Sequence, residues 1–330
     1  MSFQKIASLI NQVKAKYALL LCHQNADPDA LCAAFAFSKL LKYVDQGIET
    51  GIASPEGISK LSKLLLGELP IKMLTIKPDF EKADIIFLLD TNTIQQLGGW
   101  SQEVKTVSVP IVVIDHHASH PETEKIAAIC VSEEYSSSTC EIIYDFFKEL
   151  NLKPSQIEAE ALFLGIAFDT KHFTLANSDT FRAVSDLVDV GVNARESLSL
   201  LSLPMDLSER IARLKACQRV KLAQVNDWII AFSHVRSYQA SAARALIELG
   251  AHLAIVIGQK REEVQISLRA NQEFYEKTNF HLGRDLAKPL GEYLRGMGGG
   301  HSTSAGVDGI GDLDMVVKGS IKILKEKLER

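Results

Sequence analysis

Three short apolar runs, each ending in or followed by acidic and imidazole side chains, constrain the fold of this chain more than any other feature. The runs occupy residues 16–22 (KYALLLC), 83–90 (ADIIFLLD) and 110–117 (PIVVIDHH). Continuous short runs rich in Val, Ile, Leu and Phe, bounded by polar or turn residues, are typical of strands buried on both faces of a parallel sheet. The sequence therefore predicts an α/β fold whose helices cover a parallel sheet.

Polar clusters stand at the carboxyl end of each predicted strand. The first run leads into HQNADPD at 23–29, the second ends at Asp90, and the third ends in Asp115, His116 and His117. Ligands of open α/β sheets bind outside the carboxyl ends of the strands, so the sheet itself would bring these clusters together. Carboxylates and imidazoles are the ligand set of two neighbouring divalent cations. Our first hypothesis is a metal-dependent phosphoryl-transfer centre.

A helix is predicted directly after the first cluster. Asp27 can cap this helix and Pro28 suits its first position, while Leu31, Phe35 and Leu41 recur near helical spacing. Asp27 therefore has two interpretations, a helix cap or a metal ligand, and the presence of His23 and Asp29 beside it favours the second.

The pattern predicts two α/β domains with a cleft between them. Residues 1–190 alternate strand and helix and form the metal-binding domain, and residues 191–225 form a helical linker. Residues 226–330 restart the pattern as a smaller domain, with a helix over 282–296 that leads into a glycine-rich loop. A chain of 330 residues with 46% hydrophobic content is long enough to bury two cores.

Composition restricts the partners and the cellular compartment. With 41 acidic and 36 basic residues the net charge is −5, which argues against wrapping on duplex DNA and favours a small anionic substrate. The five cysteines are scattered and form no C-x-x-C pair, as expected in a reducing cytoplasm. The first residues lack the apolar core of a signal peptide, and no run approaches the length of a membrane span, so we expect a cytoplasmic protein without membrane contact.

Five motifs occur in the order in which the DHH superfamily of phosphoesterases carries them, and the chain resembles that superfamily over nearly its whole length. They are His23-Gln24-Asn25-Ala26-Asp27-Pro28-Asp29, Asp90-Thr91-Asn92, Asp115-His116-His117, Gly165-Ile166-Ala167-Phe168-Asp169-Thr170 and Gly298-Gly299-Gly300-His301. The resemblance implies a DHH domain followed by a DHH-associated substrate-binding domain.

The resemblance also implies a ligand set for two metal ions, with Asp90 as the bridge. One ion would be held by His23, Asp27 and Asp90, and the other by Asp29, Asp90, His116 and Asp169. Mixed imidazole and carboxylate ligation favours Mn²⁺, with Mg²⁺ or Co²⁺ as alternatives. Asp115 would orient a neighbouring histidine, and His117 would face the scissile phosphate or the leaving group. Lys171 and His172 depart from the usual small residues after the Asp-Thr pair, and we expect them in a surface loop.

Substrate-binding residues are expected in the second domain. Ser267 and Arg269 match an S-x-R pattern on one face of a predicted strand, where Arg269 could contact phosphate in a bidentate manner. The loop with Gly298, Gly299, Gly300 and His301 offers backbone N–H groups and an imidazole to an anion. Met297 replaces the first of four glycines that the family usually shows, which would stiffen this loop.

The sequence thus predicts a manganese-dependent phosphoesterase of the nanoRNase and pAp-phosphatase type. Its substrate would be a short single-stranded oligonucleotide or 3′-phosphoadenosine 5′-phosphate. The alternatives are a RecJ-like single-strand exonuclease, a linear or cyclic dinucleotide phosphodiesterase, an inorganic pyrophosphatase, and a non-catalytic nucleotide-binding protein. The oligomeric state, including a homodimer, stays open.

Overall fold

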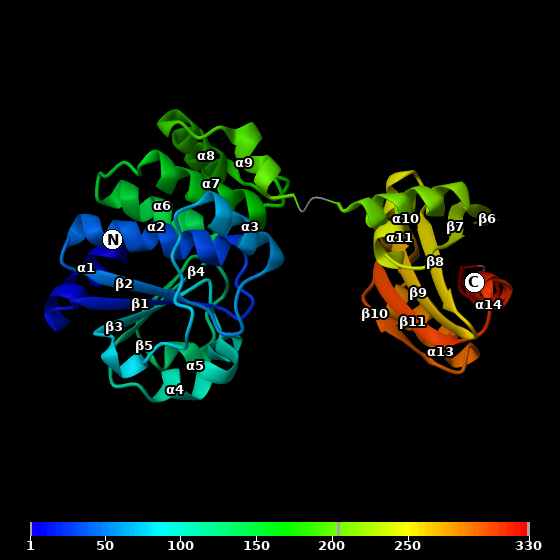
Figure 1. Cartoon of the computed structure of the whole chain (residues 1–330), viewed down its shortest axis with the longest axis horizontal. Coiled ribbons are helices and arrows are strands. Elements are labelled where there is room, and N and C mark those ends of the chain that lie inside the picture. The colour runs from blue at the N-terminus through cyan, green and yellow to red at the C-terminus, as the bar shows by residue number, and fades with distance from the viewer. Residues whose placement is uncertain (1, 203–204, 329–330) are drawn as a thin grey trace. The chain divides into compact units, whose positions relative to one another are not determined.

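The structure, a computed structural model, describes residues 2–202 and 205–328 and divides the chain into two compact units, residues 1–203 and 204–330 (Figure 1). The segment 191–225, which we expected to form a helical linker, is shared between them. It holds α9 (Ala194–Leu200) in the first unit, and α10 (Leu207–Gln218) and the strand β6 (Lys221–Val225) in the second.

The first unit is built on a five-stranded parallel sheet of order β2-β1-β3-β4-β5, which confirms the predicted α/β fold. The strands are β1 (Tyr17–Cys22), β2 (Glu49–Ala53), β3 (Ile85–Leu89), β4 (Ile111–Asp115) and β5 (Ala127–Ser132). The helices before α9 are α1 (Ser2–Val13), α2 (Pro28–Val44), α3 (Lys60–Glu68), η1 (Phe80–Lys82), η2 (Ile94–Trp100), α4 (Ser101–Thr106), α5 (Pro121–Glu124), α6 (Thr139–Glu149), α7 (Gln156–Asp169) and α8 (Ser178–Val190).

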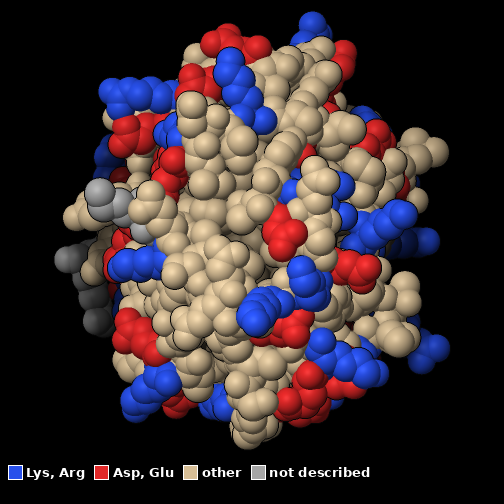
Figure 2. All heavy atoms as spheres, turned by 90° about the vertical axis from the view of Figure 1, so that its left-hand side faces the viewer, with Lys and Arg blue, Asp and Glu red and all other residues tan. Residues whose placement is uncertain are grey.

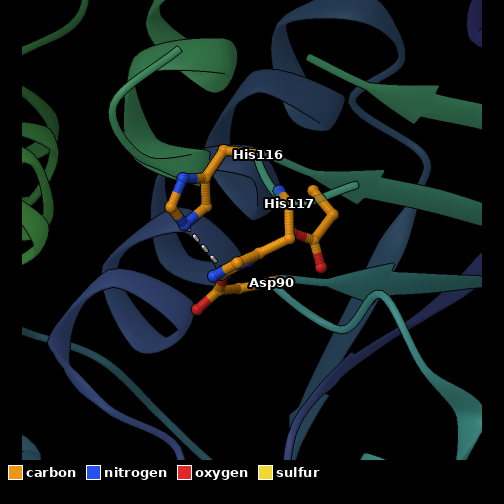
Figure 3. Close-up of side chains that lie close together, drawn as sticks. Asp90, His116 and His117 are labelled. Carbon is orange, nitrogen blue, oxygen red and sulfur yellow. Dashed lines mark hydrogen bonds and ion pairs between the residues drawn. The ribbon is translucent and has the colours of Figure 1, made fainter. Parts of the chain in front are cut away.

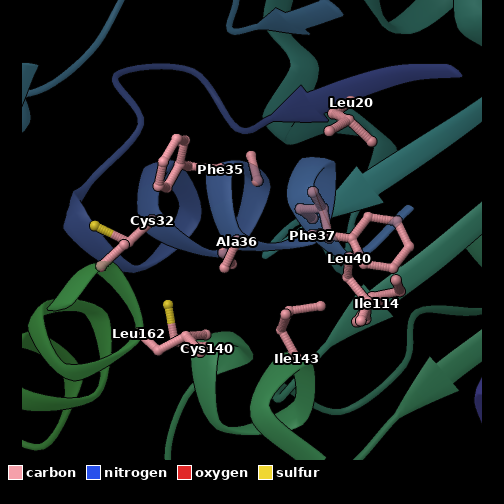
Figure 4. Close-up of a cluster of buried hydrophobic side chains, with 14 of the residues drawn as sticks. Leu20, Cys32, Phe35, Ala36, Phe37, Leu40, Ile114, Cys140, Ile143 and Leu162 are labelled. Carbon is pink, nitrogen blue, oxygen red and sulfur yellow. The ribbon is translucent and has the colours of Figure 1, made fainter. Parts of the chain in front are cut away.

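Side chains of the central strands alternate between two hydrophobic cores, one on each face of the sheet. Leu20 and Phe87 face the larger core, which α1, α2, α6 and α7 cover, whereas Leu21 and Leu88 face a smaller core beneath η2 and α4. Figure 4 shows side chains of α2, among them Phe37 and Leu40, gathered with Leu20 and Ile114 of the sheet and with side chains of α6 and α7. Burial of both faces explains why these strands have uninterrupted apolar sequences.

The expected alternation of strand and helix up to residue 190 is wrong beyond β5, because the chain from α6 to α9 is helical throughout. The apolar run of residues 161–168 (ALFLGIAF) is part of α7. It is apolar on all sides because α7 packs against α2, α6, α8 and α9.

The second unit has a mixed six-stranded sheet of order β10-β11-β9-β8-β7-β6, in which only β7 and β8 pair in parallel among the described strands. Its remaining elements are β7 (Trp228–His234), α11 (Gln239–Glu248), β8 (Leu253–Lys260), β9 (Glu263–Ala270), α12 (Gln272–Thr278), η3 (Leu282–Ala287), α13 (Lys288–Tyr293), β10 (Met297–Gly300), β11 (Ser304–Ile310) and α14 (Leu313–Leu328).

Two sequence expectations for this unit need correction. The single helix over 282–296 is divided into the π-helical turn η3 and the helix α13, and Pro289, which has no N–H for the helix ladder, stands at the junction. The glycine-rich loop is a strand, β10, which pairs with β11. A side chain at Gly298 would overlap the backbone of Ala287, so only glycine lets β10 lie this close to η3.

None of the described helices combines the length and the apolar character that crossing a bilayer requires. The face of the first unit in Figure 2 carries basic and acidic side chains interspersed around a largely uncharged centre. This face shows no continuous basic stripe of the kind that tracks a nucleic-acid backbone.

Candidate metal centre

The polar clusters predicted at the strand ends meet at one edge of the first sheet. His23 follows β1, Asp90 follows β3, and Asp115 ends β4. Because β1, β3 and β4 are consecutive in the sheet, their carboxyl ends are neighbours. His116 and His117 come directly after β4 and join the same cluster.

Asp90 lies at the centre of this cluster. Its Oδ2 is 3.7 Å from His23 Nε2, and its Oδ1 is 3.6 Å from His116 Nε2. Figure 3 shows the His116 and His117 rings directed toward Asp90. The Asp90 backbone has a φ of 52°, a left-handed conformation that Asp tolerates better than most residues. The turn after β3 thus leaves the two oxygens of one buried carboxylate facing imidazoles from two different strand ends.

A first ligand group comprises His23, Asp27 and Asp90, whose nearest ligand atoms all lie within 4.8 Å of one another. The distance from His23 Nε2 to Asp27 Oδ1 is 3.8 Å. Asp27 also caps α2, because its Oδ1 accepts a 3.1 Å hydrogen bond from Ala30 N, as the sequence predicted. The cap holds the Asp27 carboxylate in place, so its two interpretations are compatible.

A second group comprises Asp29, His116 and Asp169, again within 4.8 Å of one another. Asp169 is the last residue of α7, and its Oδ2 is 2.9 Å from His116 Nε2. Asp29 is fully buried in the first turn of α2. The sheet and two helices therefore bring together all six residues that the sequence indicated as metal ligands.

The residues that support Asp29 could not be predicted from the sequence. Asp29 Oδ2 accepts a 2.7 Å hydrogen bond from Thr139 N, and Oδ1 accepts a 3.0 Å bond from Cys140 N, both at the start of α6. The Thr139 hydroxyl also donates to Asp90 Oδ1 at 3.2 Å. Ser138, which caps α6, was a local signal for this helix start. No feature of the neighbouring sequence indicated that the N-terminus of α6, which carries a partial positive charge, would face Asp29.

Asp115 holds His117. Its Oδ1 lies 2.8 Å from both the backbone N and the ring Nδ1 of His117. Asp115 is buried, whereas the His117 side chain is 55% exposed and its Nδ1 is 3.7 Å from Asp90 Oδ1. The buried Asp115 carboxylate therefore fixes the orientation of the His117 ring, while the ring itself stays accessible to a ligand from solvent.

The pKa values of this cluster are shifted in the directions expected for an excess of negative charge. Burial, followed by repulsion from Asp27 and Asp115, raises the pKa of Asp90 to about 7. Burial and neighbouring carboxylates also hold the pKa of Asp29 well above its usual value. Burial alone would lower the pKa of His23, but the Asp27 carboxylate outweighs it and raises that pKa to about 9. Carboxylates packed this closely favour bound cations or protons.

Two buried polar atoms of the cluster, Asp115 Oδ2 and His116 Nε2, have no hydrogen-bond partner among the described residues. His116 Nε2 lies close to Asp169 Oδ2, but the two atoms are not aligned as a hydrogen bond. Two metal ligands that are directed at the same ion lie in this way. Orphaned buried atoms and a mixed imidazole and carboxylate donor set both fit divalent metal ions.

Lys171 and His172 are exposed and lie in a turn after α7, as expected for a surface loop. Together with Phe173 they form three consecutive residues of positive φ, from 49° to 67°.

The predicted substrate residues lie in the second unit, on β9, on β10 and in the turn after β10, and β11 lies between the two strands. Ser267 of β9 pairs with Gly306 of β11, which in turn pairs with Gly299 of β10, and Arg269 pairs with Ser304. Arg269 is partly buried, and burial followed by Arg244 lowers its pKa. His301 is exposed at the turn between β10 and β11.

Comparisons with known proteins agree with this geometry. Residues 18–166 match the family model of the N-terminal domain of the DHH family. An uncharacterized protein of Methanocaldococcus jannaschii is 36% identical over 321 residues, which are 97% of this chain and 94% of that protein. The similarity therefore extends over both units.

More distant similarity leads to two enzymes and a solved structure. The cyclic-di-AMP phosphodiesterase GdpP of Geobacillus thermodenitrificans is 26% identical over 87% of this chain and 44% of that enzyme. A probable manganese-dependent inorganic pyrophosphatase of Enterococcus faecalis is 27% identical over 69% of this chain and 76% of that enzyme. The crystal structure of an exopolyphosphatase-related protein from Bacteroides fragilis has a TM-score of 0.65 at 18% identity, covers 99% of this chain and 98% of its own, and shows a shared fold.

Proposed function

The chain belongs to the DHH family and is a metal-dependent phosphoesterase, and from that premise we propose that it hydrolyses short oligonucleotides, 3′-phosphoadenosine 5′-phosphate, or both, at a pair of manganese ions. The observation that carries this proposal is the position of Asp90, whose two oxygens face His23 and His116 at 3.7 and 3.6 Å. A carboxylate placed in this way is suited to bridging two ions.

Each ion has its own ligand set in this proposal. The first set is His23, Asp27 and Asp90, and the second is Asp29, Asp90, His116 and Asp169. Each carboxylate oxygen has two lone pairs, so Asp29 can accept the α6 backbone bonds and still bind a metal. When bound, two such ions lower the pKa of a shared water and neutralise charge on the attacked phosphorus. The similarity to a probable manganese-dependent pyrophosphatase supports manganese.

His117 is suited to protonating the leaving oxygen. The hydrogen bond that His117 Nδ1 donates to the Asp115 carboxylate raises the pKa of His117 to about 9, so its imidazole carries a proton at neutral pH. Asp115 fixes Nδ1, which leaves Nε2 as the ring nitrogen that would donate the proton.

Arg269 and His301 are suited to holding a phosphate of the substrate. Within the described residues Arg269 has no carboxylate partner, and its Nη1 donates only to the Leu268 carbonyl at 3.0 Å. A partly buried guanidinium without a counter-ion favours an anionic ligand. This supports a nucleotide substrate over a generic phosphodiester.

A cyclic-dinucleotide phosphodiesterase is the second candidate. The similarity to GdpP covers 87% of this chain and so includes both units. The two candidates share the metal centre and differ only in the ligand that is cleaved.

The test compares purified wild type with Asp90→Asn. We expect hydrolysis of a dinucleotide or of 3′-phosphoadenosine 5′-phosphate to require a divalent ion, to be faster with Mn²⁺ than with Mg²⁺ or Co²⁺, and to fall to background in the variant. Asp189→Asn, which changes an exposed carboxylate of α8, is the matched control and should keep full activity.

The substrate panel also includes cyclic-di-AMP, pyrophosphate and a ~20-residue single strand. Fastest cleavage of cyclic-di-AMP would establish the second candidate. Processive degradation of the long strand would support the exonuclease alternative. Full activity of Asp90→Asn, or activity after exhaustive chelation, would refute the two-metal proposal.

A further inference from the structure

A basic pocket lies in the second unit at the end of its sheet where β8 turns into β9. The pocket has a volume of about 480 Å³, and Arg219, His234, Arg236 and Arg261 line it. An adjoining hollow shares Arg219 and Arg236 and adds Lys215. None of the described residues that line either hollow is Asp or Glu. Three guanidinium groups therefore surround one cavity without an acidic side chain in its wall.

The three arginines of this pocket have no acidic partner within ion-pair distance among the described residues. Two acidic side chains, Glu263 and Asp308, line a neighbouring hollow that shares Arg236. None of the described ion pairs includes Arg219, Arg236 or Arg261, and the recorded side-chain hydrogen bond of Arg219 is with the carbonyl of His234 at 3.3 Å. Burial, and then the charges of Arg219 and Lys221, lower the pKa of His234. Burial is the larger cause, and the smaller contribution of Arg219 and Lys221 is that of positive charges near the pocket wall.

The backbone at Arg261 gives a second, independent indication. Lys260 pairs with Glu263, so Arg261 and Glu262 form a two-residue turn between β8 and β9. Arg261 has a φ of 59°, in the first position of this turn, where Gly is the favoured residue. An arginine held in a conformation that favours glycine suggests that its side chain has a role.

This pocket is separate from the predicted substrate residues of the same unit. Arg269 lies near the other end of β9, and the strand from Glu263 to Arg269 spans about 20 Å at ~3.3 Å per residue. A single phosphate group cannot contact both Arg269 and Arg261.

We propose that the pocket of Arg219, Arg236 and Arg261 is a phosphate-binding site distinct from the Arg269 and His301 set. Planar guanidinium groups with unused N–H donors can contact the oxygens of a phosphate in a bidentate manner, and three of them around one cavity suit an anion of more than one negative charge. The ligand is either a free phosphate compound or the backbone phosphate of an oligonucleotide. The site does not depend on the proposed hydrolytic activity.

The test measures binding to the full chain by calorimetry, with metal chelated and in an Arg269→Ala background, so that the other anion-binding residues contribute little. The probes are inorganic phosphate, pyrophosphate and a single-stranded pentanucleotide. The Arg219→Gln/Arg236→Gln variant should bind about 10- to 100-fold more weakly, since it loses charge-assisted contacts. The Lys322→Gln/Lys325→Gln variant removes the same charge from exposed α14 residues and should bind like its parent.

Arg261→Gly separates binding from folding, because glycine suits the turn. We expect weaker binding with an unchanged or higher melting temperature. Binding of pyrophosphate as tight as that of the pentanucleotide would identify a free phosphate compound, and binding of the pentanucleotide alone would identify a nucleic-acid backbone. Unchanged affinity in both arginine variants, or no binding of any probe, would overturn the proposal.

Discussion

Substitution of Gly165 by alanine should damage both the stability of the first unit and its metal site. Gly165 lies in α7, where the helix passes closest to α6 and to the buried Asp29. A methyl group at this position would overlap Cys140 Sγ, lie 2.7 Å from Asp29 Oδ1 and lie 3.0 Å from Cys140 Cβ. Rotation of the Cys140 thiol can relieve the first contact but not the other two.

The expected loss follows from three contributions. Inserting a methyl group into a closed core costs about 1–3 kcal/mol. Displacing Asp29 Oδ1 weakens its 3.0 Å bond to Cys140 N, a charge-assisted bond worth about 1.5–3 kcal/mol. Alanine recovers about 1 kcal/mol through its higher helix propensity. The net loss is roughly 1.5–5 kcal/mol, which in a unit of about 200 residues corresponds to roughly 3–20 °C in melting temperature.

Urea unfolding and thermal melting measure this loss, and Mn²⁺ titration measures the displacement of Asp29. Gly67→Ala is the matched control, because a methyl group there meets no atom within 4 Å on the exposed side of α3. That variant should be stabilised by about 0.5–1 kcal/mol and should bind Mn²⁺ like wild type. If Gly165→Ala is as stable as Gly67→Ala and binds Mn²⁺ equally well, the close contact of α7 with Asp29 is not required.

Three further predictions concern other parts of the molecule. Asp115→Asn should lower the pH at which His117 titrates from about 9 toward its usual 6.5, as NMR of the metal-free chain would record, because the hydrogen bond to Asp115 is the main cause of the raised pKa. Phe37→Ala should cost about 3–5 kcal/mol in urea unfolding, since the Phe37 ring is fully buried, with its centroid 4.8 Å from that of Phe87. Asp285→Asn should cost the second unit about 1 kcal/mol at neutral pH, because the hydrogen bond with Arg284 lowers the pKa of Asp285 below its usual 3.8. A depressed carboxyl pKa stabilises the folded state above the unfolded pKa, so this difference should be constant above about pH 5 and disappear as the pH falls toward 2; a difference that persists there would contradict the assignment.

Local patterns predicted those features that depend on near neighbours in the chain. The strands β1, β3 and β4 were visible as apolar runs, and the cap of α2 was visible as Asp27 followed by Pro28. The convergence of His23, Asp90 and His116 required one further assumption, that the three strands share a sheet. Parallel strands place their carboxyl ends at the same edge, so this assumption was enough.

Features that depend on close approach between distant segments were not predicted. The sequence did not indicate that β10 is a strand, because Gly298 is explained only by the backbone of η3 that lies against it, and Gly300 only by the backbone of β11. It also did not indicate that Thr139 and Cys140 would donate to Asp29 across 110 and 111 residues of sequence.

The sequence by itself therefore determined the chemistry of this protein, through which residue types stand at the ends of which strands. The tertiary structure alone decided how that chemistry is supported: which helix end faces Asp29, where Gly165 must be small, and which arginines of the second unit surround one pocket. The physical reason is the distance along the chain over which each kind of interaction acts. Hydrophobic periodicity and capping act over a few residues and leave a pattern in the sequence, whereas packing between segments depends on many small contacts that no local pattern records.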